Sequence, residues 1–210
     1  MLARVSDRWL DWTATVLLAL ATVATAWAAY QSRQWTGEQS QGYSHATAKR
    51  IAVNRASALA NRQVQIDVAA FIQWVDARLR HDTKVADFYR TRFRDEFKPA
   101  FAAWLATRPF TNPAAPRTPF DVPQYRLRAS VEADDLERAA AADSEGAKAA
   151  NQRADNYMLA VVLFASALFF AGISAKVDTR GARLAILGIG CVIFLATLIW
   201  VGTIPARLTV

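Results

Sequence analysis

The chain has 210 residues, a net charge of +7, one cysteine and 53% hydrophobic residues. A single cysteine excludes disulfides within the chain and metal sites built from several cysteines. Charges of both signs are interspersed rather than gathered on a basic face, so we expect no nucleic-acid partner. The hydrophobic residues are concentrated in three long runs, which predict an integral membrane protein.

The first run predicts a transmembrane helix over residues 12–30, after a short N-terminus of residues 1–11. Aromatic residues flank the run, as in the interfacial belts of a spanning helix: Trp9, Trp12, Trp27 and Tyr30. Ala26 and Ala28 also fit a signal-peptide cleavage site. Because acidic residues precede the run, and because it is long enough to span, we expect an uncleaved signal anchor.

Residues 31–156 are predicted to form a helical extramembrane domain that is inserted between the first and second spans. Residues 31–42 are polar, and Gly37 and Gly42 lower the helix propensity there. From Tyr43 to Arg80, apolar residues at spacings of three and four predict one long helix, while no heptad array is evident. The predicted stripe consists of Ala56, Ala60, Val64, Val68, Phe71, Val75 and Leu79.

The middle of this domain is rich in aromatic residues and proline. His81–Thr83 breaks the helical pattern, and Asp82 or Thr83 is expected to cap the next helix. Pro99 predicts a new helix or a kink. Prolines recur through residues 109–123, and this segment is predicted to be an ordered tip that packs through Phe110, Phe120 and Tyr125. We interpret the preceding aromatic series as core rather than as a ligand site: Phe88, Phe93, Phe97, Phe101 and Trp104.

The last part of the domain, from Leu127 to Asn156, has a strongly helix-forming composition. It is expected to continue without a break into a second span, residues 157–175, and to run antiparallel to the Tyr43–Arg80 helix. At about 1.5 Å per residue this second run can cross a bilayer core of about 30 Å. A basic turn at 176–183, a third span at 184–206 and a tail at 207–210 complete the predicted topology.

Basic residues of short loops tend to stay in the cytoplasm. The N-terminus and the 176–183 turn share one side of a three-span protein, and they contain Arg4, Arg8, Lys176, Arg180 and Arg183. We therefore expect a cytoplasmic N-terminus and an extracytoplasmic domain in a bacterial plasma (inner) membrane.

No motif for catalysis, cofactor binding or metal binding is evident, so no such site residues and no cofactor are predicted, and the protein is not expected to be an enzyme. His45 and His81 have no paired carboxylate at ligand spacing. Arg90, Arg92 and Arg94 are expected to spread around a helix. We interpret an acidic band as a solvated helix face rather than a cation site: Glu132, Asp134, Asp135, Glu137, Asp143 and Glu145.

Three segments resemble a group of uncharacterised bacterial three-span membrane proteins: Trp35–Gln39, Phe93–Phe101 and Leu163–Ile173. The arrangement of one span, a helical middle and a C-terminal hairpin is similar as well. The resemblance implies a bacterial envelope protein with no assigned activity, and it implies no functional residue.

The leading hypothesis is a non-enzymatic structural or interaction protein whose partners are membrane lipid and either further copies of itself or a second membrane protein. Small-residue rows at Ala21, Thr25 and Ala29, and at Ala167 and Ala171, favour close helix contacts. The alternative is a small oligomeric channel lined by hydroxyl side chains such as those of Thr22 and Ser166. A third hypothesis, an enzyme or ligand sensor, requires a concave site with convergent polar groups near Phe110–Tyr125.

Overall fold

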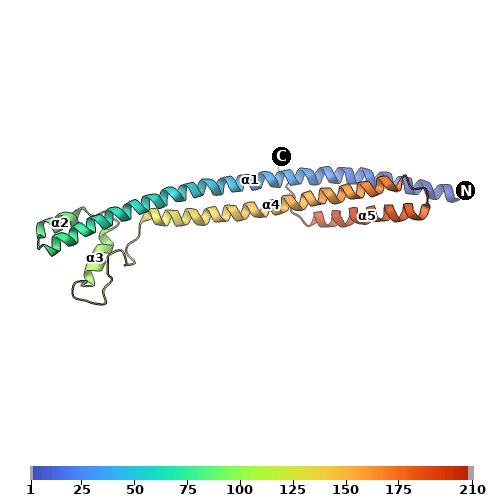
Figure 1. The fold of residues 1–210 in the computed structure, drawn as a ribbon. Helices are drawn as coiled ribbons and strands as arrows, with labels where there is room; N and C mark the ends of the chain where they lie inside the picture. Colours follow the sequence, from blue (N-terminus) through green and yellow to red (C-terminus); the bar gives the residue numbers. More distant parts are fainter. Residues whose placement is uncertain (1, 208–210) are drawn as a thin grey trace. The chain divides into compact units, whose positions relative to one another are not determined.

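The computed structural model describes the backbone of residues 2–207 and the side chains of residues 8–207, so residues 208–210 of the predicted tail lie outside the description. The fold is all-α, as predicted, and no β-strand occurs in residues 2–207. Along the chain the helices are α1 (Leu2–Leu79), α2 (Thr83–Arg92), α3 (Lys98–Ala106), α4 (Arg128–Ser174) and α5 (Arg180–Gly202) (Figure 1). The chain divides into two compact units. Within the described residues, the first unit consists of residues 2–44 and 143–207, and the second unit is His45–Ala142.

Three helices, α1, α4 and α5, are long and apolar enough to cross a membrane, as the sequence predicts. In the first unit these helices expose large apolar side chains, which water-soluble surfaces seldom do over a continuous area. The exposed residues include Val16, Leu20, Val23, Leu159, Val162, Phe169, Val192, Leu195 and Ile199. Trp9 and Trp12, expected in one aromatic belt, are also exposed. These surfaces are suited to contact with lipid.

Helix α1 is continuous from Leu2 to Leu79, so the low helix propensity of the polar segment 31–42 does not interrupt it. A Cβ atom placed on Gly42 would lie 2.9 Å from the Cβ atom of Ala147, so the glycine lets α4 approach α1 closely. Helix packing of this kind outweighs a propensity cost of about 1 kcal/mol per glycine. Gly37 has no such neighbour.

The first unit is packed through buried residues, most of them small, that recur every seven positions, which corrects the expectation that the chain has no heptad array. On α1 the buried series is Ala14, Ala21, Ala28 and Trp35. On α4 two buried series are Ala147 and Ala154, and Ala160, Ala167 and Ser174. A repeat of seven residues keeps one face of a helix against a neighbour over many turns. The contacts of Ser32 with Ala154 and of Gly42 with Ala147 show that α1 and α4 are antiparallel here.

Helix α5 folds back on α4, with the Phe164 and Phe194 ring centroids 5.5 Å apart. The chain beyond α5 is then fixed to α1. Gln31 is fully buried and forms two hydrogen bonds of 2.9 Å with the backbone of Arg207. The Trp35 indole N–H donates to the Pro205 carbonyl, and the guanidinium of Arg207 pairs with Glu38 at 2.6 Å. Residues 31–38 therefore hold the C-terminal segment of the first unit.

The second unit has an aromatic core between the end of α1 and the α2–α3 segment. Asp82 caps α2 by accepting a hydrogen bond from the Val85 N–H, as predicted. Pro99 lies in the first turn of a new helix, α3, where proline is tolerated. The core contains Phe71, Trp74, Phe93, Phe97, Phe101 and Trp104, while Phe120 and Tyr125 of the proline-rich segment pack against it.

The predicted α1 stripe is correct in part. Ala56, Ala60 and Phe71 are buried, but Leu79 is 71% exposed. Asp67 and Trp74, which lie outside the predicted stripe, are buried instead. Phe88 of the predicted aromatic core is half exposed and lies beneath the guanidinium of Arg92.

Candidate functional site

An open pocket of about 410 Å³ lies in the second unit, between the end of α1, helix α2 and the segment after α3. We call it the arginine pocket, because three arginines contribute to its wall. It is lined by Trp74, Arg78, Thr83, Ala86, Asp87, Arg90, Leu105, Arg108, Pro109, Phe110 and Thr111. Its volume lies within the range of about 300–1,000 Å³ that is usual for small-molecule sites.

The lining of the arginine pocket is strongly cationic. Arg90 pairs with Asp87 at 3.3 Å, and both side chains are more than half exposed. Within residues 8–207, Arg78 and Arg108 have no carboxylate at ion-pair distance. Three guanidinium groups therefore face one carboxylate, and the pocket carries a net positive charge.

Aromatic rings form the apolar part of this pocket. The ring centroids of Trp74 and Phe110 are 6.4 Å apart, and Phe110 is 60% exposed. By contrast, Phe120 packs flat against Phe97 at 5.2 Å, and Tyr125 meets Phe97 at 5.9 Å. The concave site considered for Phe110–Tyr125 therefore exists at Phe110, whereas the Phe120–Tyr125 end is filled core.

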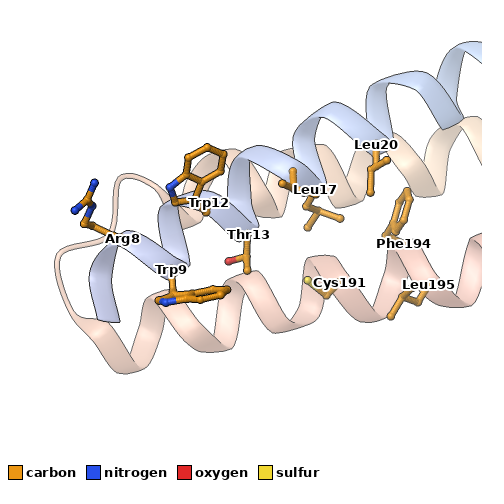
Figure 2. Close-up of a pocket in the computed structure, with 10 residues that line it drawn as sticks. Arg8, Trp9, Trp12, Thr13, Leu17, Leu20, Cys191, Phe194 and Leu195 are labelled. Carbon is orange, nitrogen blue, oxygen red and sulfur yellow. The ribbon is translucent and has the colours of Figure 1, made fainter. Parts of the chain in front are cut away.

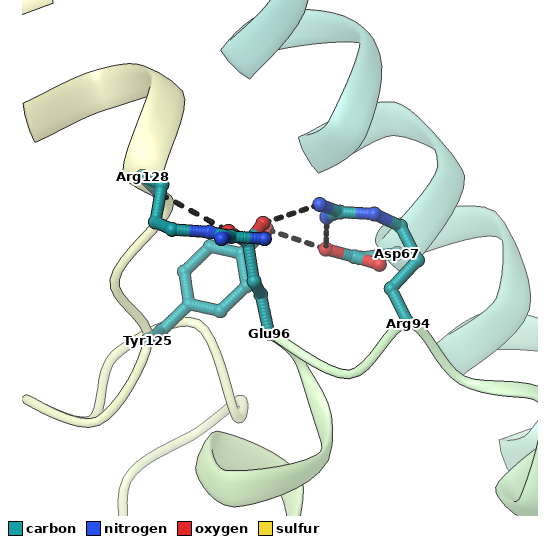
Figure 3. A network of polar contacts seen from close by, with 5 residues as sticks. All are labelled: Asp67, Arg94, Glu96, Tyr125 and Arg128. Carbon is teal, nitrogen blue, oxygen red and sulfur yellow. Dashed lines mark hydrogen bonds and ion pairs between the residues drawn. The ribbon is translucent and has the colours of Figure 1, made fainter. Parts of the chain in front are cut away.

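A second polar feature of this unit, shown in Figure 3, is centred on Asp67, whose side chain is only 1% exposed. One Asp67 carboxylate oxygen accepts hydrogen bonds from Arg94 at 2.8 Å and from the Tyr125 hydroxyl at 3.1 Å. Arg94 also pairs with Glu96, and Glu96 accepts a hydrogen bond of 2.8 Å from Arg128. The network joins α1, the α2–α3 turn, the end of the proline-rich segment and the start of α4.

The charges in this network balance, which indicates a structural role. Burial raises the pKa of the Asp67 carboxyl above its usual range, although Arg94 and Tyr125 act in the opposite direction. Burial and the neighbouring Asp67 also raise the pKa of the Tyr125 phenol, so it remains a hydrogen-bond donor. The hydrogen bond from Arg128 lowers the pKa of Glu96, which keeps that carboxylate ionised.

An apolar groove of about 770 Å³ lies in the first unit between the N-terminal part of α1 and α5 (Figure 2). Trp9, Trp12 and Leu20 of α1 line it, together with Cys191 and Phe194 of α5, and Arg8 lies at one end. Near that end Arg183 pairs with Asp11. Its lining is largely apolar, as in a site for a hydrocarbon chain.

The hydroxyl residues proposed as a pore lining bond to their own helices. Thr22 donates to the Leu18 carbonyl at 2.7 Å, Thr25 to Ala21 at 2.6 Å, and Ser166 to Val162 at 2.9 Å. This pattern satisfies a hydroxyl group without water or a partner. The small residues Ala21, Ala167 and Ala171 are fully buried within the chain, so they are not free for contacts between copies.

The other residues singled out in the sequence do not converge. Arg90 pairs with Asp87, Arg92 covers Phe88, and Arg94 joins the Asp67 network, so the three arginines separate as predicted. His45 and His81 are exposed, and no group of three or more potential metal ligands occurs among residues 8–207. In the acidic band, Asp135 pairs with Arg138 and Glu145 with Lys148.

Sequence reasoning missed both the arginine pocket and the buried Asp67. Arg78, Arg90 and Arg108 come from three segments, and no sequence spacing relates them. The one available signal was the position of Asp67 between apolar residues at helical spacing, which places a carboxylate on the buried face of α1.

Comparison with known proteins provides no relative, since no family model, curated protein or solved structure matches this chain. The resemblance to bacterial three-span membrane proteins therefore remains a prediction from the sequence.

Proposed function

We propose that this protein is a non-enzymatic structural or interaction protein of the bacterial plasma membrane. In this proposal α1, α4 and α5 cross the bilayer through the first unit, and the second unit lies outside the cytoplasm. The basic residues of the N-terminus and of the 176–183 turn support this orientation. Lipid chains occupy the groove between α1 and α5, where the lining is apolar and Arg8 can meet a headgroup.

The observation that carries the proposal is an exposed apolar surface on α1 within the second unit. Leu59 and Ile66 are 42% and 57% exposed. The two residues are seven positions apart, so they lie on one face of the helix, two turns apart. Pairs at this spacing are typical of a surface that packs against a partner helix. We propose that α1 forms a homo-oligomer through this surface.

The test is native mass spectrometry of the full-length protein extracted gently from its own membrane. We expect a defined oligomer of the wild type and loss of that oligomer in the double variant Leu59→Glu, Ile66→Glu. The matched control is Ala58→Glu, Gln65→Glu, which adds the same charge at adjacent exposed positions with the same spacing. The control is expected to keep the wild-type stoichiometry.

A monomeric wild type, or an oligomer that survives the Leu59 and Ile66 substitutions, would rule out the proposed surface. A complex with a different polypeptide would replace self-association by an accessory role. Oligomerisation combined with ion conductance in planar bilayers would favour the channel hypothesis over the structural one.

A further inference from the structure

We propose that the arginine pocket binds a small, water-soluble organic dianion, such as a phosphate monoester or a dicarboxylate. The charged end of the ligand contacts Arg78 and Arg108, and its apolar body lies against Trp74 and Phe110. This binding site goes beyond the proposed structural role and does not depend on the oligomeric state of the protein.

Charge selects the ligand class. The lining carries three guanidinium groups and one carboxylate, which leaves two positive charges to be balanced. The Asp87 carboxylate is paired with Arg90, so Arg78 and Arg108 are the groups left to receive the ligand. Guanidinium groups form paired hydrogen bonds with carboxylate and phosphate oxygens, which favours these anions over halides. Thr83 and Thr111 also line the pocket, and the Thr111 hydroxyl donates to the Arg108 carbonyl at 3.4 Å.

The apolar part of the pocket selects for an organic body. Trp74 is largely buried and offers only part of its ring, while Phe110 is 60% exposed beside it. A ligand that covers Phe110 removes an exposed aromatic surface from water, which inorganic phosphate cannot do. The affinity of an aryl phosphate should therefore exceed that of inorganic phosphate.

The backbone at Arg108 gives a separate reason to assign a role to its side chain. Arg108 follows α3 in the left-handed region, with φ of 57°, where glycine is the least strained residue. His81, which follows α1, has a similar φ of 61° but does not line the pocket. A glycine at either position should relieve the same strain, but only at Arg108 would it remove a guanidinium group from the pocket.

The binding test uses isothermal titration calorimetry on the full-length protein in phosphatidylcholine nanodiscs, with 1-naphthyl phosphate as the probe. Empty nanodiscs correct for partition into lipid. We expect saturable binding of 1-naphthyl phosphate, weaker binding of inorganic phosphate and no binding of 1-naphthol, which lacks the charge.

Variants then locate the site. Arg78→Gln and Arg108→Gly should each weaken 1-naphthyl phosphate binding by about tenfold or more, and Arg108→Lys should retain part of the affinity. Arg117→Gln is the charge-matched control, because Arg117 is an exposed arginine of the same unit outside the pocket. His81→Gly is the backbone control: like Arg108→Gly it should raise the thermal unfolding temperature, but it should leave binding unchanged.

Absence of saturable binding, or equal loss of affinity in Arg117→Gln, would overturn the proposal. Loss of affinity in His81→Gly would show that the backbone rather than the guanidinium is responsible, and would also overturn it. If phosphatidic acid in the nanodiscs abolishes probe binding as completely as Arg108→Gly does, the site belongs to a lipid headgroup and the soluble ligand is excluded. Equal probe affinity in both kinds of nanodisc is the expected result.

Discussion

Asp67 is a buried carboxylate, and the free-energy cost of burying its charge is offset by Arg94, which comes from another segment of the chain. Its side chain is 1% exposed, and Arg94 is the cation bonded to it. Desolvation of a carboxylate costs several kcal/mol, and a partner repays that cost only with well-formed hydrogen bonds. We therefore expect the Asp67–Arg94 pair to fix how the α2–α3 turn packs on α1, while adding little to the net stability of the second unit.

Replacing either partner of this pair alone should lower stability, but by unequal amounts. Arg94→Met leaves a buried, unpaired carboxylate and is expected to cost about 3 kcal/mol, whereas Asp67→Asn removes the buried charge and is expected to cost about 1 kcal/mol. Hydrogen–deuterium exchange of peptides from residues 45–142, measured on the full-length protein, reports the local opening free energy. Equal costs for the two variants would contradict this account.

The pH dependence of Arg94→Met provides a second prediction. The pKa of Asp67 is raised in the folded state, so the folded state takes up the proton first as the pH falls. The stability that the protonated form provides is present at low pH and is lost as the pH rises through the folded-state pKa. Arg94→Met removes a group that lowers this pKa, so its deficit relative to wild type should shrink between about pH 7 and about pH 4.5.

The control for this titration is the double variant Asp67→Asn, Arg94→Met, which has no carboxyl group at position 67. The stability deficit of the double variant relative to wild type should not shrink at low pH, in contrast to the deficit of Arg94→Met. A similar recovery in the double variant would assign the pH dependence to a different group, such as Glu96, whose pKa is lowered by Arg128.

Helices α1 and α4 show what a sequence pattern can and cannot predict. The three apolar runs, the break at His81–Thr83 and the continuation of α4 from Arg128 to Ser174 follow from hydropathy and helix propensity alone. The continuity of α1 through residues 31–42 does not, because Gly37 and Gly42 lower the helix propensity there; the structure shows α1 continuous, with Gly42 close to Ala147 of α4. The arginine pocket is even harder to predict from the sequence, because its charged residues come together only after α1, α2 and the segment beyond α3 have packed.

The two glycines of α1 should respond to alanine in opposite ways. Gly37→Ala meets no atom within 4 Å and should raise stability by about 1 kcal/mol through helix propensity. In Gly42→Ala the new Cβ atom would lie 2.9 Å from Ala147 Cβ, so α1 and α4 must move apart at this point. The lost packing should exceed the gain in helix propensity and lower stability by about 1 kcal/mol. Thermal unfolding in one detergent, followed by circular dichroism, compares them. Stabilisation by both substitutions would show that close helix approach at Gly42 is unimportant.

At the scale of the whole molecule, the proposed topology has three helices crossing the membrane and residues 45–142 outside the cytoplasm. Cys191 is the only cysteine, so Cys191→Ala provides a background without thiols. Ala114 of the second unit and Asp178 of the turn before α5 are both exposed, and each can be replaced by cysteine in that background.

The most direct measurement is labelling of these two variants in spheroplasts with a membrane-impermeant maleimide. If the proposed topology is right, Ala114→Cys is labelled in intact spheroplasts and Asp178→Cys is labelled only after permeabilisation. Labelling of Asp178→Cys alone would place the second unit in the cytoplasm. Labelling of both variants in intact spheroplasts would contradict the three-span topology itself.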